Sequence, residues 1–391
     1  MSRSALCIVA GPEGYGVRRI WSTLIAGLLE HGWVVTIAVL ERGHAQAWKD
    51  AFPGATVAAA EKPVLLGGSA AGTFGRYLSM LRRGFTQLGL AAWLWRVVKS
   101  SDADCILFQG PLESALAGLI ARLSGLKAYW FVPNAIDTTK PFDLNRRIYR
   151  ALFRHAHVIP LSNSRHTDST FGPGRFERHV VHLGIDTDHY KPGFDPAPVR
   201  SQFAIPDDAP LIGLFARMHP SKGQLRLIEA LADSRTNFHI LFCGGPKDGP
   251  YVAALRHRVS ALNIENRVHI AGPQSDLRPY YAACDVIASL YDGVEGFGLT
   301  LVEAMACEKP AFAHGAGGPG ETVLDGQTGW LIATSDTAAI AAGLKRVASD
   351  RPRWKAMGRL GRNHTIAHFS QARFQAEFLH LLCARSKDMP R

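Results

Sequence analysis

Short apolar strand patterns alternate with helical patterns along this 391-residue chain, and the alternation begins twice. In the first half, a strand at 5–10 leads into a helical pattern at 20–29 and a second strand at 34–40. Residues 191–210 then hold five prolines with mixed charge, which is typical of a linker, and a strand at 211–216 starts the pattern again. Strands that alternate with helices favour parallel sheets covered by helices. The sequence therefore predicts an α/β protein with one domain at 1–190, a second at 205–365, and a C-terminal amphipathic helix at 366–391.

The composition is that of an ordinary globular protein, with 47% hydrophobic and 20% charged residues. Arg or Gly interrupts the longest apolar runs before they reach the roughly 18 residues that suggest a membrane-spanning helix. The six cysteines show no paired spacing. This pattern indicates reduced core residues in a cytoplasmic protein and not a disulfide or zinc framework.

The net charge of +11 is unevenly distributed. Residues 62–101 contain six basic residues and no acidic one, together with Trp93 and Trp95. Such a stretch suits a phosphate-rich partner. Because no nucleic-acid-binding pattern accompanies it, we expect an anionic membrane surface or a nucleotide and no nucleic acid. Two alternatives remain for this stretch: a helix lying on an anionic bilayer, or a core helix whose basic residues are solvated.

A loop and helix at 292–307, DGVEGFGLTLVEAMAC, follow an apolar strand at 286–290. The helix pattern starts near Gly298, and a helix N-terminus offers unpaired N–H groups to a phosphate. Glu303 lies about 7 Å further along the helix axis, where its carboxylate can accept hydrogen bonds from a ribose diol, while Glu295 can meet a second sugar on the loop side. The alternative is a helix start with ordinary acidic enrichment.

Residues suited to binding a phosphate or a sugar also follow other strands. Arg217 and Lys222 follow the strand at 211–216, at the sheet edge where open α/β sheets bind ligands. Gly244 lies in a glycine loop, where a ligand could approach the backbone closely. Near the N-terminus, Gly14 and Gly16 form either a tight strand-to-helix turn or a loop that brings backbone to a phosphate or acceptor. The spacing of Gly11, Gly14 and Gly16 differs from the dinucleotide fingerprint G-x-G-x-x-G, which disfavours a nicotinamide oxidoreductase.

The segment EGFGLTLVEAMA resembles the acidic signature of retaining glycosyltransferases with the GT-B fold, family 4, also called glycosyl transferases group 1. The resemblance covers nearly the whole chain and is strongest from about 180 to 332. It implies two Rossmann-like domains that face each other across a cleft, with the C-terminal helix crossing back to the first domain. It also implies transfer of a sugar from a nucleotide diphosphate-sugar to a hydroxyl with retention, in the assembly of a cell-surface polysaccharide or glycolipid.

The resemblance assigns roles to particular residues. Arg217 and Lys222 would grip the donor diphosphate and, with Glu295, form the catalytic group. The donor-binding residues would be Gly14, Gly16, Gly244, Gln274, Leu277, Gly296, Phe297, Gly298, Leu299, Thr300 and Glu303. We expect no metal and no further cofactor, because the two cations supply the positive charge. The acceptor would be lipid-linked or an oligosaccharide, and the protein cytoplasmic, with a peripheral position on the inner face of the plasma membrane if residues 62–101 dock there.

One departure concerns the first domain. Many members of this family carry a His at the end of the strand that corresponds to 128–132, whereas this sequence has Pro133 there, followed by Asn134. Which residue replaces that His is open. Two further functions stay open as alternatives: a nucleotide-sugar epimerase of the same fold, and a non-catalytic nucleotide-sugar-binding partner subunit.

Overall fold

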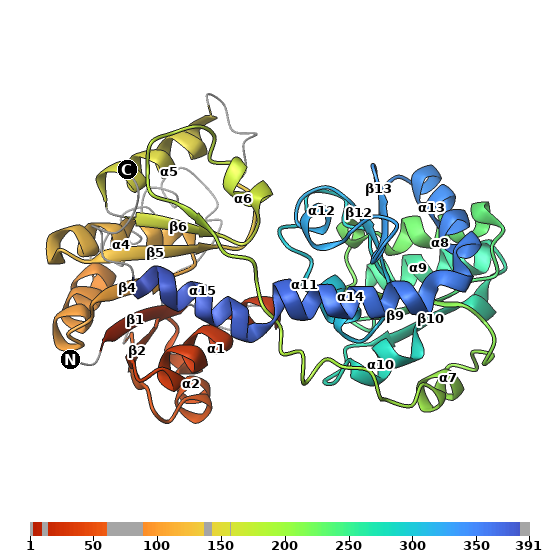
Figure 1. Cartoon of the computed structure of the whole chain (residues 1–391), viewed down its shortest axis with the longest axis horizontal. Helices are drawn as coiled ribbons and strands as arrows, with labels where there is room; N and C mark the ends of the chain where they lie inside the picture. The colour runs from red at the N-terminus through yellow and green to blue at the C-terminus, as the bar shows by residue number, and fades with distance from the viewer. Residues whose placement is uncertain (1–2, 10–14, 61–88, 137–142, 157, 384–391) are drawn as a thin grey trace. The chain divides into compact units, whose positions relative to one another are not determined.

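The computed structural model describes residues 3–9, 15–60, 89–136, 143–156 and 158–383, although the side chains of 15–17 and 111–115 are not described. The chain divides into two compact units. The first contains residues 1–163, 167–181 and 375–391, and the second contains 164–166 and 182–374. Figure 1 follows the chain through both units from red to blue.

The first unit is built on a seven-stranded parallel sheet in the order β3-β2-β1-β4-β5-β6-β7. Its central strands read as apolar runs, and all six residues of the first strand are buried, as expected when helices cover both faces of a parallel sheet. The strands are β1 (Ser4–Val9), β2 (Val34–Val39), β3 (Thr56–Ala59), β4 (Cys105–Phe108), β5 (Lys127–Val132), β6 (Val158–Ser162) and β7 (His179–Val180).

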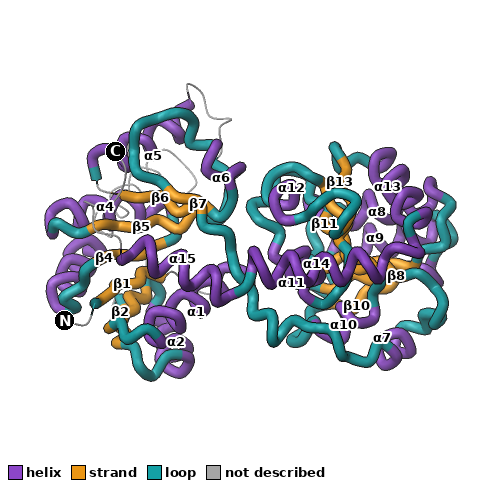
Figure 2. The backbone as a smooth tube through the Cα atoms, viewed as in Figure 1, coloured by secondary structure: helices purple, strands orange, loops and turns teal. Residues whose placement is uncertain are grey.

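Helices surround this sheet (Figure 2). They are α1 (Tyr15–Glu30), α2 (Ala45–Ala51), an unlabelled helix at 89–100, α4 (Pro111–Ser124), α5 (Leu144–His155), α6 (Arg165–Ser169) and α15 (Gln371–Cys383). The last of these belongs to the first unit from Gln375 onward, where the Gln375 side chain donates to the Thr23 carbonyl at 3.0 Å. The end of the chain thus packs with elements from its beginning.

The second unit repeats the same plan with a six-stranded parallel sheet in the order β10-β9-β8-β11-β12-β13. Its strands are β8 (Leu211–Phe215), β9 (His239–Cys243), β10 (Val268–Gly272), β11 (Val286–Ser289), β12 (Ala311–His314) and β13 (Gly329–Ile332). Its helices are α7 (Ala197–Gln202), α8 (Gln224–Ser234), α9 (Pro250–Ala261), α10 (Arg278–Ala283), α11 (Leu299–Ala306), α12 (Pro319–Thr322), α13 (Thr337–Ser349) and α14 (Trp354–Phe369).

Both strand orders are those of the doubly wound nucleotide-binding fold. The chain therefore contains two Rossmann-like units, which confirms the predicted fold class. In each sheet the order reverses beside the first strand of the unit, between β1 and β4 and between β8 and β11. Ligands bind open α/β sheets at such a point, outside the carboxyl ends of the strands.

The proline-rich stretch at 191–210 differs from the prediction, because it is not a free linker. Helix α7 forms inside it, and Arg200 is only 7% exposed. The Arg200 guanidinium donates to the carbonyls of Pro206, Ala209 and Ala283 and pairs with Asp285 at 3.1 Å. These contacts hold the stretch to the second unit. The prolines here begin a helix and shape turns, which composition alone does not distinguish from an open linker.

Candidate functional site

The residues expected to bind the donor diphosphate lie at the switch point of the second sheet. Arg217 and Lys222 follow β8, and residues 295–300 follow β11, which is the neighbouring strand. The two loops contact each other directly, because the Asp292 amide donates to the Ser221 carbonyl at 2.7 Å. The fold thus brings together two segments that lie about seventy residues apart in the sequence, at the edge where this fold binds ligands.

Lys222 and Glu295 form an ion pair, with 3.2 Å between Nζ and Oε2. Both side chains are about a quarter exposed. The ammonium also lies 4.3 Å from the centre of the Tyr291 ring, where the ring face attracts a cation. The carboxylate and the ring hold Lys222 at one place beside the loop that follows β11.

Arg217 is exposed, and among the described residues its guanidinium has no hydrogen-bond or ion-pair partner. Its carbonyl accepts a hydrogen bond from the side chain of Gln224 at 2.9 Å, which fixes the backbone at the end of β8. The charge of Arg217 is therefore uncompensated within the described structure. Such a guanidinium fork is suited to phosphate oxygens.

The N-terminus of α11 supplies further hydrogen-bond donors for an anion. Gly298 caps this helix in the left-handed conformation, with φ of +89°, which glycine adopts without strain. No carbonyl of the described residues accepts from the amides of Leu299 or Thr300. These two N–H groups therefore stay available at the positive end of the helix, an arrangement that binds anions.

Glu303, which the sequence predicts to accept hydrogen bonds from a ribose diol, is buried, at 3% exposure. Its Oε2 accepts a hydrogen bond of 2.7 Å from the Tyr281 hydroxyl, and Tyr281 is fully buried. Burial and the neighbouring Glu303 carboxylate raise the pKa of Tyr281 well above its ordinary value, so this hydroxyl keeps its proton and donates. Glu303 is thus held in one orientation by a residue of α10.

The other predicted donor residues of this unit come from the loops after β9, β10 and β11. Gly244 has φ of +142°, and a Cβ there would collide with the Ala216 carbonyl. The Gln274 side chain donates to the Ala271 carbonyl at 2.9 Å, and Leu277 immediately precedes α10. Gly296 and Phe297 are buried. All these positions lie at the carboxyl edge of the sheet.

Two predicted residues belong to the first unit. Gly14 lies outside the described residues, and Gly16 is in the first turn of α1. Pro133, which immediately follows β5, lines a pocket of about 220 Å³ in this unit. Trp130, Asn134, Asn145 and Tyr149 also line it, and the Trp130 and Tyr149 rings lie 4.8 Å apart. Aromatic faces combined with amide side chains suit a polar ring such as a sugar.

Sequence reasoning missed a cluster around Glu321, because the local pattern indicates only a carboxylate at a helix start. His182 Nε2 lies 2.9 Å from Glu321 Oε2, and the amides of Arg165 and His166 donate to the same carboxylate at 2.9 and 2.8 Å. Burial raises the pKa of Glu321, but these hydrogen bonds outweigh it and lower the pKa below its ordinary value. The centre of the His182 ring also lies 6.2 Å from that of Phe297, in the loop that the sequence predicts to bind the donor.

The described residues offer no cluster for a metal ion. No group of three or more His, Cys, Asp or Glu side chains there is placed to hold one. Asp186 and Asp188 form an Asp-x-Asp pattern, but the Asp186 carboxylate accepts from the amides of Asp188 and His189 and so builds a turn. As for membranes, no helix in the described part of the chain is long and apolar enough to cross one.

Known proteins with similar sequences are glycosyltransferases. The profile of the family described as "Glycosyl transferases group 1" matches residues 197–364. A GDP-mannose-dependent alpha-(1-6)-phosphatidylinositol monomannoside mannosyltransferase of Mycolicibacterium smegmatis is 30% identical over 313 residues, which cover 76% of this chain and 80% of that protein. The chain belongs to the glycosyl transferases group 1 family.

Two further similarities concern about half of the sequence and the overall fold of this group 1 glycosyltransferase. The D-inositol 3-phosphate glycosyltransferase of Corynebacterium glutamicum is 34% identical over 182 residues, or 44% of this chain and 43% of that protein. The crystal structure of Anabaena Alr3699/HepE in complex with UDP has a TM-score of 0.81 at 20% identity and covers 98% of this chain and 99% of that one. This structural likeness shows the GT-B fold. The family membership shows a transferase, as the sequence predicted.

Proposed function

We propose that this group 1 glycosyltransferase moves a sugar from a nucleotide diphosphate-sugar to a hydroxyl acceptor with retention of the anomeric configuration. The observation that supports it is the convergence at the β8–β11 switch point of the Arg217 guanidinium, which has no partner among the described residues, with a positioned ammonium and a helix N-terminus. Three groups that attract anions at a single sheet edge suit a diphosphate.

The donor would be bound in three parts. Arg217, Lys222 and the amides of Leu299 and Thr300 would hold the diphosphate, and the Glu303 carboxylate would accept from the ribose diol. Glu295, which pairs with Lys222 at 3.2 Å, would meet the hydroxyls of the transferred sugar. The loops with Gly244, Gln274 and Leu277 would receive the base.

The reaction breaks the bond between the anomeric carbon and the diphosphate oxygen and forms a bond from that carbon to the acceptor oxygen. Negative charge develops on the departing diphosphate, so the cations and the helix N-terminus stabilise the transition state more than the ground state. The acceptor's proton passes to the leaving diphosphate oxygen. Attack on the face that the diphosphate leaves preserves the anomeric configuration.

The acceptor would use the pocket of the first unit that contains Trp130, Asn134 and Tyr149. Its volume of about 220 Å³ suits one polar ring, with the aromatic faces beneath it and the amides at its hydroxyls. The Mycolicibacterium relative is named for a phosphatidylinositol monomannoside. We therefore propose a lipid-linked sugar or polyol as the acceptor class, in glycolipid or polysaccharide assembly.

Docking on an anionic membrane is a separate part of this proposal. Lys62, Arg76, Arg82 and Arg83 lie outside the described residues. In the helix at 89–100, Leu90, Leu94, Val97 and Val98 pack into the core, whereas Arg96 and Lys99 are exposed. The described part thus favours the core-helix alternative. Sedimentation with anionic liposomes tests docking, which should weaken in an Arg82→Glu/Arg83→Glu variant and fall with salt.

The proposed activity is tested by product analysis. The enzyme is incubated with GDP-mannose and a phosphatidylinositol-linked mannoside, the pair suggested by the relative's name, and then with other donors. NMR of the purified product gives the anomeric configuration, which should match that of the donor. An inverted product would contradict retention. Isomerisation of the donor without acceptor would point instead to an epimerase.

A further inference from the structure

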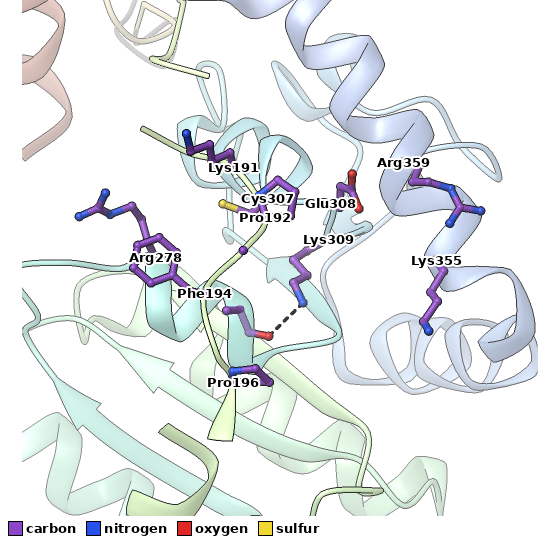
Figure 3. A pocket seen from close by; sticks show the side chains of 12 residues that line it. Lys191, Pro192, Phe194, Pro196, Arg278, Cys307, Glu308, Lys309, Lys355 and Arg359 are labelled. Carbon is purple, nitrogen blue, oxygen red and sulfur yellow. Dashed lines mark hydrogen bonds between the residues drawn. The ribbon is translucent and has the colours of Figure 1, made fainter. Parts of the chain in front are cut away.

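A second pocket, of about 310 Å³, lies within the second unit and is not used by the proposed transfer reaction. Its walls come from the stretch at 191–196, helix α10, the residues 307–309 that follow α11, and the first turns of α14 (Figure 3). The proposed diphosphate site uses the N-terminal end of α11, whereas this pocket uses the residues just beyond its C-terminal end. With about 1.5 Å per residue, the two sites are roughly 12 Å apart along that helix.

The lining is strongly basic. It contains one carboxylate, that of Glu308, against five cationic side chains: Lys191, Arg278, Lys309, Lys355 and Arg359. Across the described residues, three of those cations (Lys191, Lys355 and Arg359) have no hydrogen-bond or ion-pair partner. The pocket therefore holds an excess of positive charge that nothing in the described structure neutralises.

Two of the cations are held in place. The Arg278 guanidinium is bound by the Asp276 carboxylate at 2.8 Å and lies 4.9 Å from the centre of the Phe194 ring. Lys309 donates to the Ala282 carbonyl at 3.0 Å, the bond drawn in Figure 3. Burial lowers the pKa of Lys309 from its ordinary value. Both side chains are therefore positioned before any ligand arrives.

The other side of the pocket carries a pair of like charges. Lys355 and Arg359 are four residues apart on α14 and both are exposed; Figure 3 shows the two side chains on the same helix. Like charges at this spacing destabilise a helix slightly. A bound anion would remove that repulsion.

We propose that this pocket is a binding site for a phosphate-bearing ligand, separate from the donor site. Ammonium groups, together with a guanidinium stacked on an aromatic ring, are the groups that bind phosphate oxygens by charge-assisted hydrogen bonds. The volume of about 310 Å³ accommodates a phosphate or diphosphate group. The ligand can be a soluble phosphate compound or the headgroup of an anionic lipid, because the two present the same chemistry.

The test uses inorganic pyrophosphate and isothermal titration calorimetry on the full chain. Because pyrophosphate would also enter the proposed donor site, the titrations are made in an Arg217→Ala/Lys222→Ala background. There we expect binding to persist, and adding Lys355→Glu/Arg359→Glu should weaken it by about 10-fold or more. The matched control adds Lys345→Glu/Arg256→Glu, which makes the same change of charge at exposed positions outside the pocket and should weaken binding less than about twofold. Thermal unfolding confirms that each variant is folded.

Vesicle flotation distinguishes the two sources of phosphate. Loss of binding to phosphatidic acid vesicles in the Lys355→Glu/Arg359→Glu variant, but not in the control variant, assigns a lipid headgroup. If the Lys355→Glu/Arg359→Glu variant loses pyrophosphate binding but still binds the vesicles, the ligand is a soluble phosphate compound. The proposal is overturned if pyrophosphate does not bind the Arg217→Ala/Lys222→Ala protein, or if the pocket and control variants weaken binding equally. Neither result depends on whether the transferase reaction is correctly assigned.

Discussion

Replacing Glu303 with Ala separates its proposed role in donor binding from its role in packing. The carboxylate is 3% exposed and accepts the Tyr281 hydroxyl at 2.7 Å. If it also accepts from the ribose diol, removing it leaves ligand hydroxyls unpaired and should weaken donor binding by about 1–3 kcal/mol, or roughly 5- to 150-fold in Kd. The same change leaves the Tyr281 hydroxyl buried without this acceptor, so the free energy of unfolding should fall by about 1–3 kcal/mol.

Tyr281→Phe is the matched control, because it removes the same internal hydrogen bond but keeps the carboxylate. We expect it to lower the free energy of unfolding by about 1 kcal/mol and to change donor Kd less than about threefold. The double variant should recover part of the stability lost by Glu303→Ala, since no hydroxyl is then left unpaired. Calorimetry gives Kd, and urea unfolding gives stability. If Glu303→Ala lowers stability but leaves donor Kd within about twofold of wild type, Glu303 is a structural residue and the ribose assignment is wrong.

Lys222→Ala should lower kcat/KM by about 10- to 100-fold through loss of one charge-assisted hydrogen bond to the departing diphosphate; an unchanged value in steady-state assays would remove it from the catalytic group. Asn134→Ala should raise the acceptor KM but leave the donor KM unchanged, and equal effects on both would contradict the acceptor pocket. Activity should persist in excess EDTA, whereas complete loss that Mg²⁺ or Mn²⁺ restores would show that the diphosphate site is misinterpreted. Burial, and then the neighbouring His239, lower the pKa of His269 from 6.5 to about 4. Between these pH values the unfolded state binds more protons than the folded state, so the free energy of unfolding should fall as pH drops from 6.5 to 4. His269→Asn should flatten this part of the pH dependence, and an unchanged slope would show that His269 does not cause it.

The sequence was most informative where a local pattern determines the structure. The loop and helix at 292–307 and the cations after β8 could be placed because strand ends, glycines and helix starts are local features. The strands at 5–10, 34–40, 128–132, 211–216 and 286–290 were predictable for the same reason, whereas β3 and β13 were not assigned. Both follow glycine-containing turns, and their sequences, TVAA and GWLI, do not form a longer apolar run.

What could not be predicted depends on contacts between distant segments. The Lys222–Glu295 pair joins residues 73 positions apart, and the Glu303–Tyr281 bond joins two helices whose packing no spacing reveals. Glu303 stands among apolar residues in LTLVEAMA, which signals burial, but nothing local names its partner. The basic pocket is likewise assembled from four segments, so its charge excess is invisible in any single stretch.

The central claim is that the second unit binds a nucleotide diphosphate-sugar through Arg217 and Lys222 at the β8–β11 switch point. Thermal unfolding against a panel of nucleotide diphosphate-sugars tests it most directly, since a ligand at 100 times its Kd adds about 2.7 kcal/mol to the free energy of unfolding. We predict that at least one donor stabilises the wild-type protein and that an Arg217→Ala/Lys222→Ala variant loses this stabilisation. Equal stabilisation of both proteins, or none by any donor in the panel, would contradict the assignment.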